Sequence, residues 1–328
     1  MLAQSPLQLM AVVQWITDYR PKSYDLVLIY DPRSVENLKQ MIQVNALFKL
    51  SQFEVIKNTG VSSFFKYAKF IKRAMNQNYD CALIGGYGSF HQALIANLNA
   101  AIFLIDDGAD AFDVLQKMTA MGPNWGLRER GLKVLRFRAL GLKSRIKDPI
   151  RIYFYSFLLD HSENVPRVVN HRFESLKSVL IENSAKREDN NREFFIDTPL
   201  VESGLVSVNV IELAYKKAIM MGSQKLVYIP HRSQHHSVSQ QLASRLGLET
   251  IVPEVPVELY FMINALEPSK IFGTATSAIF SLKLLFPGCL FCVFDIRPFL
   301  SVKENLKSYN RFYESAAKKG ISIVSLES

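Results

Sequence analysis

The chain has 328 residues, which is too long for one typical hydrophobic core, so two domains are expected. Its 48% hydrophobic and 21% charged residues are typical of an ordinary globular protein. No stretch of roughly eighteen residues is apolar and free of charge, which argues against a transmembrane helix. The net charge, 39 − 30 = +9, predicts an acidic partner: a nucleic acid, an anionic lipid, or an acidic small molecule or glycan. Zinc-finger and RNP-type motifs are absent, so no nucleic-acid partner is expected.

The N-terminal stretch and the cysteines predict a cytoplasmic protein. The opening MLAQSPLQLMAVVQWITDYR lacks a basic leader and a small-residue cleavage site, so no signal peptide is expected. Three cysteines fit a reducing compartment rather than a disulfide scaffold. Cys289 and Cys292 form a C-x-x-C pair inside a predicted strand, where this offset puts them on opposite faces. Because no second pair completes a metal site, core packing is the preferred interpretation and no metal is expected.

The first part of the chain alternates apolar runs with helical stretches. Such alternation predicts a parallel sheet with helices on both faces. Strands are expected at 24–31, 53–58, 80–89 and 101–108, with helices at 34–48, 62–77 and 90–99.

The middle of the chain, roughly 111–195, is less regular and strongly basic. Residues 128–147 contain eight Lys or Arg and one Glu, interleaved with Leu, Val and Phe. This segment is either a solvated basic face or a surface for a polyanionic substrate or an anionic membrane. The polar stretch 182–193 is the candidate linker. We therefore expect an N-terminal, acceptor-side domain over 1–193 and a C-terminal, donor-binding domain over 194–328.

Strand–helix alternation restarts after the linker and predicts a second α/β domain. Two Rossmann-like, doubly wound domains facing a central cleft are the GT-B architecture, which glycosyltransferases and a sugar-nucleotide epimerase share, so the fold alone does not choose a function. Strands are expected within 192–201, 225–232, 249–254, 270–277, 289–296 and 321–326, and helices within 207–222, 237–247, 256–266 and 277–288 and before the last strand.

Two aspartates end the run "IFLIDDGAD" (102–110), where a buried strand is expected to stop. Asp-Gly is common turn chemistry, which is one explanation for Asp106, Asp107 and Gly108. The other is a catalytic carboxylate, because ligands of open α/β sheets bind beyond the carboxyl ends of the strands.

Two further polar clusters close predicted strands in the second domain. His231 and Arg232 follow "LVYIP", and "GTATS" follows "KIF". The helix after Ser277 offers unpaired N–H groups and a positive dipole end, which suit a phosphate. Hydroxyls at Thr276 and Ser277 add donors, Arg232 adds charge at the phosphate or in a structural ion pair, and His231 is able to protonate a leaving phosphate. Each cluster alone is a weak signal, because Thr and Ser before a helix are ordinary N-caps and a lone His at a strand end is more often a bonded structural residue than a ligand.

Taken together, these motifs resemble bacterial GT-B sialyltransferases and polysialyltransferases, including those that complete lipooligosaccharides and capsules. That group carries an acidic-acidic-Gly motif, an "HP" motif and a Ser/Thr pair in this order. "DDG" matches the first and "TS" at 276–277 the third, whereas Arg232 stands where the second has Pro. "SPLQL" (5–9) and "TPLVESG" (198–204) also look like this group.

The resemblance implies roles for individual residues. Asp106 would be the general base on the acceptor hydroxyl, and Asp107 would orient it or shape the turn. His231 would bind the CMP phosphate and act as the acid. Glu258 would hold the cytidine ribose, although a first-turn Glu favoured by the helix dipole explains it equally. The donor-binding set is completed by Arg232, Gly273, Thr274, Thr276 and Ser277.

On the acceptor side, Ser5, Gly86 and Gly108 are the candidates. Ser5 and the following Pro are equally explained as a helix cap, and the glycines around Gly86 match no phosphate-binding fingerprint.

The expected function is an inverting, metal-independent transfer of sialic acid, or a related acidic sugar, from a CMP-sugar to a surface glycan or glycolipid, without a cofactor. The alternatives are another GT-B transferase or epimerase using a UDP- or CMP-Kdo-type donor, or a non-catalytic polyanion-binding protein. The basic segment 128–147 also predicts peripheral contact with an anionic membrane at the inner face of the inner membrane.

Overall fold

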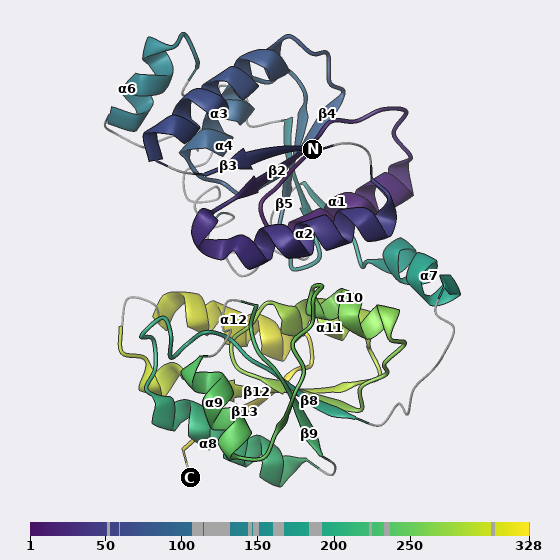
Figure 1. Ribbon diagram of the computed structural model, residues 1–328, viewed down its shortest axis with the longest axis vertical. Coiled ribbons are helices and arrows are strands. Elements are labelled where there is room, and N and C mark those ends of the chain that lie inside the picture. Colours follow the sequence, from purple (N-terminus) through teal and green to yellow (C-terminus); the bar gives the residue numbers. More distant parts are fainter. Residues whose placement is uncertain are drawn as a thin grey trace. The chain divides into compact units, whose positions relative to one another are not determined.

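The computed structural model describes residues 1–50, 53–58, 60–106, 114, 132–143, 146, 151–159, 167–183, 192–222, 225–232, 237–302 and 306–327. These residues form two compact units, Met1–His171 (unit 1) and Arg172–Ser328 (unit 2). Each unit contains one parallel β-sheet covered by helices (Figure 1), so the expectation of two Rossmann-like α/β domains is confirmed. No helix among these residues has the length and apolar character needed to cross a membrane.

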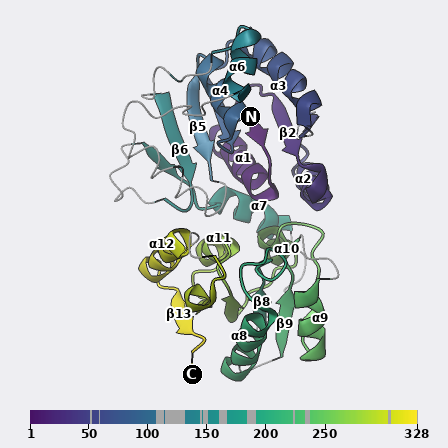
Figure 2. The ribbon, with the colours of Figure 1, turned by 90° about the vertical axis from the view of Figure 1, so that its left-hand side faces the viewer.

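Unit 1 contains a seven-stranded sheet in the order β3-β2-β1-β4-β5-β6-β7. The direction of strand addition reverses between β1 and β4, which is the topological switch point of the sheet. Helices α1 and α2 contact each other, and α3 contacts α4, which contacts α6 (Figures 1 and 2). The strands are β1 (Leu2–Ala3), β2 (Leu26–Tyr30), β3 (Phe53–Lys57), β4 (Cys81–Gly85), β5 (Ala101–Ile105), β6 (Ile152–Ser156) and β7 (Val168–Asn170); the helices are α1 (Pro6–Tyr19), α2 (Val35–Phe48), α3 (Gly60–Met75), α4 (Ser89–Asn97) and α6 (Leu132–Ala139).

The start of unit 1 shows how local sequence builds this sheet. Ser5 Oγ accepts the N–H of Gln8 at 3.3 Å, and Pro6 occupies the first helical position, so α1 begins directly after β1. Along α1, the ring of Trp15 packs against Phe103 of β5, with centroids 4.5 Å apart. This contact fixes α1 on the sheet through an aromatic core.

Unit 2 contains a six-stranded sheet in the order β10-β9-β8-β11-β12-β13, with its switch point between β8 and β11. Phenylalanine rings from β8, β11 and β12 form its centre: Phe195 and Phe272 each stack on Phe294 with centroids 6.1 Å apart. The strands are β8 (Glu193–Ile196), β9 (Leu226–Ile229), β10 (Glu249–Thr250), β11 (Lys270–Gly273), β12 (Leu290–Asp295) and β13 (Ser322–Ser325); the helices are α7 (Glu174–Asn183), α8 (Val208–Met221), α9 (Val238–Arg245), α10 (Val257–Ile263), α11 (Ala278–Leu285) and α12 (Leu306–Lys318).

Helix α7 begins before the expected linker 182–193, overlaps its first two residues and belongs to unit 2. It contacts α10, and Lys177 Nζ donates to the carbonyl of Leu285 at 2.5 Å. Phe173, directly before α7, and Leu176 within it are both fully buried. The compact units therefore divide between His171 and Arg172, earlier than the boundary at 193/194 expected from composition.

Candidate functional site

Four of the candidate donor-binding residues of unit 2 lie at the switch point between β8 and β11, namely Gly273, Thr274, Thr276 and Ser277. Gly273 ends β11 and pairs with Ile196 of β8. A Cβ atom at Gly273 would lie 2.9 Å from the Ile196 carbonyl oxygen and 3.2 Å from Ile279 Cδ1. The two strands and α11 thus approach one another so closely that only glycine fits without displacement.

Gly273→Ala is expected to lower the free energy of unfolding by about 1–3 kcal/mol, because a backbone carbonyl has to move to admit the methyl group. Urea denaturation measures this. Gly288→Ala is the matched control in the same unit, since a methyl group at Gly288 would meet no atom within 4 Å. Equal stability of the two variants would show that the strands separate freely at this point.

The turn after Gly273 presents hydroxyl groups before the N-terminus of α11. Thr276 N donates to the Thr274 carbonyl at 2.8 Å, which makes the turn tight, and Thr276 Oγ1 accepts the N–H of Ala278 at 3.4 Å. Thr274 is fully buried, and its Oγ1 has no hydrogen-bond partner among the described residues. The Ser277 side chain makes no capping bond to the helix. This end of α11 therefore combines a positive dipole end with hydroxyl donors, a combination suited to an anion.

Glu258 lies on α10 and is joined to α11. It is 4% exposed, and Ser281 Oγ donates to its Oε1 at 2.5 Å. Burial raises the pKa of the Glu258 carboxyl, while the Ser281 hydrogen bond and the charge of Arg232 oppose the shift. The hydrogen bond from Ser281 gives the Glu258 carboxylate a structural partner. The electrostatic effect of Arg232 on the Glu258 pKa shows that Arg232, next to His231, is close enough to interact with this carboxylate.

His231 follows β9, the strand beside β8, and is partly buried. Burial, together with the positive charge of Arg232, lowers its pKa to about 4, and the charge of Glu202 acts in the opposite direction. The imidazole is therefore neutral near pH 7 when no ligand is bound. An incoming phosphate would raise its pKa, because a nearby negative charge favours the protonated ring.

Asp197 is a residue of this switch point that the sequence patterns did not reveal. It follows β8, is 1% exposed, and its Oδ2 accepts hydrogen bonds from the hydroxyls of Tyr215 and Tyr228, both at 2.8 Å. Its N–H donates to the Ile229 carbonyl at 3.0 Å, which ties the ends of β8 and β9 together. A single Asp after a predicted strand was the only available signal, and neither tyrosine is near it in sequence.

In unit 1, Asp106 follows β5 and is 2% exposed. Its Oδ2 accepts the N–H groups of Phe157 at 2.7 Å and Leu158 at 3.3 Å, so it connects the carboxyl ends of β5 and β6. This arrangement fixes the orientation of the carboxylate. Asp107 and Gly108, the rest of the predicted motif, lie outside the described residues.

Ser5 and Gly86 lie at the switch point of unit 1, after β1 and β4 respectively. Gly86 has φ +101°, a left-handed conformation that favours glycine. Gln4 and His91, which no sequence motif singled out, organise this end. Gln4 Nε2 donates to the Gly85 carbonyl at 2.7 Å and lies 2.6 Å from His91 Nε2, while the Gly88 N–H donates to His91 Nδ1 at 3.1 Å. The two loops are thus joined through Gln4, which is partly buried, and His91, which is buried.

Acidification is expected to destabilise unit 1 through His91. Burial lowers its pKa to about 4, below the value near 6.5 of an unfolded chain. Between these values the unfolded state binds more protons, so stability falls as the pH drops from 6.5 to 4, by about 3 kcal/mol for this residue. Thermal unfolding at pH 7 and pH 4.5 measures the loss. His91→Asn, which keeps an acceptor for Gly88, is expected to show a smaller loss on acidification; an unchanged loss would contradict the assignment.

The described parts of the chain resemble solved glycosyltransferases and nucleotide-sugar epimerases in fold. An α/β-galactoside α-2,3-sialyltransferase from Photobacterium phosphoreum matches with TM-score 0.56 and 11% identity, over 98% of this chain and 96% of that one. A putative UDP-N-acetylglucosamine 2-epimerase from Listeria monocytogenes gives 0.53 and 11%, over 96% and 85%. The spinosyn forosaminyltransferase SpnP gives 0.50 and 12%, over 100% and 86%. No protein-family model and no curated protein matches the chain.

These likenesses confirm the predicted GT-B class of fold, in which two Rossmann-like domains are used by glycosyltransferases and by epimerases. At this level of identity they concern the fold alone. The choice of donor and reaction has to be argued from the residues at the two switch points.

Proposed function

We propose that this protein is an inverting, metal-independent glycosyltransferase that moves sialic acid, or a related acidic sugar, from a CMP-sugar to a glycan. The observation that supports the proposal is the set of hydroxyl groups at the N-terminus of α11, at the unit 2 switch point. Strand β11 leads to the buried Thr274 hydroxyl, to Ser277, whose side chain makes no capping bond, and to the N-terminus of α11. Strand β8 lies between β11 and β9, and β9 leads to His231. The "DDG" and "TS" motifs and the fold shared with a sialyltransferase support it.

In the donor site, the CMP phosphate would lie at the N-terminus of α11. Thr276 and Ser277 would donate hydrogen bonds to it, with Gly273 allowing the close approach and Arg232 adding positive charge. Glu258 would accept hydrogen bonds from the ribose hydroxyls. As the phosphate raises the pKa of His231, the imidazole becomes able to give a proton to the leaving group.

On the acceptor side, Asp106 would take the proton of the acceptor hydroxyl, with Asp107 and Gly108 shaping the same loop. The acceptor oxygen attacks the anomeric carbon, and the bond from that carbon to the phosphate oxygen breaks as CMP leaves with the electron pair. One such displacement inverts the anomeric configuration. Ser5 and Gly86 are proposed to contact the acceptor at the neighbouring strand ends. Positive charge from Arg232 and α11 would take the place of a metal at the phosphate.

A second candidate function is a UDP-sugar transferase or epimerase, which the likeness to a putative UDP-N-acetylglucosamine 2-epimerase favours. A CMP-Kdo donor would use the same phosphate contacts as CMP-sialic acid. Lipooligosaccharide or capsule chains, including polysialic acid, are the acceptors that the sequence motifs suggest. The proposed enzyme would work in the cytoplasm, where activated sugars are supplied.

Thermal unfolding with CMP, UDP and GDP, each with and without magnesium, tests the proposal. A ligand that binds the folded state raises the melting temperature by mass action. A CMP-selective rise that does not depend on magnesium is the expected result, followed by turnover of CMP-sialic acid. A larger rise with UDP would favour the second candidate, and absence of any nucleotide effect would contradict both.

Glu258→Gln is expected to remove the preference for CMP over 2′-deoxy-CMP. In the wild-type protein, the carboxylate would favour the full ribose by roughly tenfold in affinity, in line with one charge-assisted hydrogen bond. Titration calorimetry with both nucleotides measures the preference. Ser281→Ala is the matched variant: it removes the structural partner at 2.5 Å but leaves the carboxylate, so it should retain the preference. Retention of the preference in Glu258→Gln would assign Glu258 a structural role only.

A further inference from the structure

The outer face of α3 and α6 in unit 1 is strongly basic. Neither helix contains Asp or Glu. Only α6 lies within the basic segment 128–147, so the sequence pattern pointed to the cations of α6 but not to those of α3. The cations whose side chains the structure describes are Lys66, Lys69, Lys72 and Arg73 on α3 and Arg136 and Arg138 on α6.

The two helices lie side by side (Figures 1 and 2), and we treat their exposed outer sides as one surface. The rings of Phe64 on α3 and Phe137 on α6 pack with centroids 4.9 Å apart. The segment that follows α6 is held to α4 by two hydrogen bonds between Asn97 and the backbone of Lys143, at 2.8 and 2.9 Å. We call this surface the α3–α6 face.

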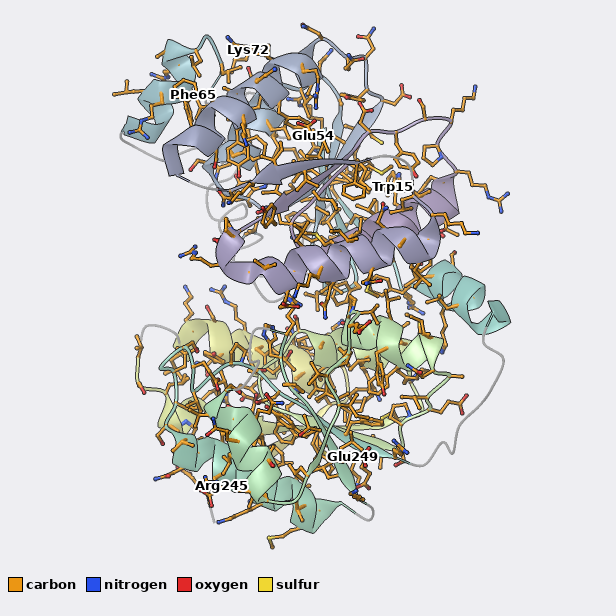
Figure 3. All side chains as sticks on the ribbon, in the orientation of Figure 1. Trp15, Glu54, Phe65, Lys72, Arg245 and Glu249 are labelled. Carbon is orange, nitrogen blue, oxygen red and sulfur yellow. The ribbon has the colours of Figure 1, made fainter. Side chains whose placement is uncertain are left out.

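Large apolar side chains project from the α3–α6 face between the cations. Phe65 and Leu135 are each 59% exposed, although neighbouring Phe64 and Phe137 are used for packing. Figure 3 shows Phe65 and Lys72 along the outer side of α3. An exposed ring next to an exposed leucine suits insertion at the boundary of lipid headgroups and acyl chains.

The lysines on this face are available for a partner. Lys66, Lys69 and Lys72 are exposed and form no ion pair with a residue that the structure describes. Arg73 differs, because it pairs with Glu54 on β3. Three unneutralised ammonium groups on one helix, with Arg136 on the next, are complementary to a surface of negative headgroups.

We propose that the α3–α6 face binds the surface of an anionic lipid membrane, with Phe65 and Leu135 entering the headgroup region. The membrane is favoured over a nucleic acid because apolar and cationic side chains alternate on the same face. This inference concerns unit 1 and does not depend on which sugar or nucleotide the protein uses.

Co-sedimentation with vesicles tests the proposal at physiological salt. The protein should bind vesicles of phosphatidylcholine mixed with phosphatidylglycerol and leave vesicles of phosphatidylcholine alone in solution. Each cation near an anionic surface contributes roughly a factor of five, so Lys66→Gln/Lys69→Gln/Lys72→Gln should weaken binding on the order of a hundredfold. Phe65→Ser should weaken it several-fold without changing the net charge.

The matched control is Lys22→Gln/Lys307→Gln/Lys318→Gln, which removes the same charge from exposed positions elsewhere. An equal loss in the control, or equal binding to neutral vesicles, would overturn the proposal. Equally tight binding of a DNA duplex that is unaffected by Phe65→Ser would overturn it in favour of a nucleic-acid surface. Circular dichroism checks that the variants fold. The CMP-dependent thermal shift should be the same in all of them, so its absence would count against the proposed enzyme and not against the membrane surface.

Discussion

Asp106→Asn is expected to lower kcat for sugar transfer by roughly 10²–10⁴-fold, the range for loss of a general base, while leaving the CMP-dependent thermal shift unchanged. Asparagine has nearly the same shape as aspartate, and its carbonyl oxygen is able to accept the Phe157 N–H that now binds Asp106 Oδ2 at 2.7 Å. The variant therefore keeps the connection between β5 and β6 but loses the group that takes the proton. Transfer to a glycan acceptor from CMP-sialic acid, with product analysis, is the measurement.

Two further variants separate chemistry from structure at this position. Asp106→Ala removes the acceptor of the buried Phe157 N–H, whereas the Leu158 N–H keeps Ser156 Oγ at 3.1 Å, so the variant should also destabilise unit 1 by about 1–3 kcal/mol. Asp80→Asn, at an exposed position before β4, is the control for loss of a negative charge and should have little effect. Full activity in Asp106→Asn would assign Asp106 to structure alone and move the proposed base to Asp107.

His231→Asn is expected to lower kcat by roughly 10²–10⁴-fold with a smaller effect on CMP affinity, because an amide donates a hydrogen bond to phosphate but does not supply a proton. The ligand-free imidazole has a pKa of about 4, since burial and Arg232 both disfavour its charged form. CMP should shift this pKa upward. NMR titration of the His231 ring with and without CMP measures the shift directly.

Arg232→Gln provides the complementary test of the same pair. Removing the neighbouring positive charge should raise the pKa of His231 in the ligand-free protein, yet weaken CMP binding if Arg232 also contacts the phosphate. A raised pKa with unchanged CMP affinity would mean that Arg232 tunes the histidine without touching the donor. A His231 pKa that stays near 4 when CMP is bound would contradict its role as the acid.

The alternation of apolar runs and amphipathic stretches was sufficient to predict two α/β domains, because each strand and helix is coded by nearby residues. The contacts that organise the switch points are not local. Gln4 joins Gly85 and His91, and Asp197 joins Tyr215 and Tyr228, so no spacing within a motif reveals them. Strand order has the same origin: β1 lies beside β4 because of packing across the whole unit.

The candidate residues were found where a polar side chain directly follows an apolar run. This rule found Asp106, His231 and the segment from Gly273 to Ser277, all of which lie at carboxyl ends of strands. The rule did not single out Asp197, although "FFID" has the same pattern. A single carboxylate without a second motif residue indicated no particular reaction. The basic face of α3 was missed for another reason: its lysines are regularly spaced along a helix, and only contact with α6 joins them to the segment 128–147.

The attachment of α7 to α10 determines where this chain can be joined to another protein of the same fold. A chimera joined at residue 194 would divide β8 after its first residue and take Glu193 from the other parent. Glu193 is 1% exposed and lies 3.8 Å from the Lys270 ammonium, so this ion pair would then join residues of two different parents. It would also take α7 from the other parent, so that Phe173 and Leu176 would face an α10 with which they did not evolve. Joining the parents at Arg172 transfers α7, β8 and the whole sheet of unit 2 as one cooperative piece.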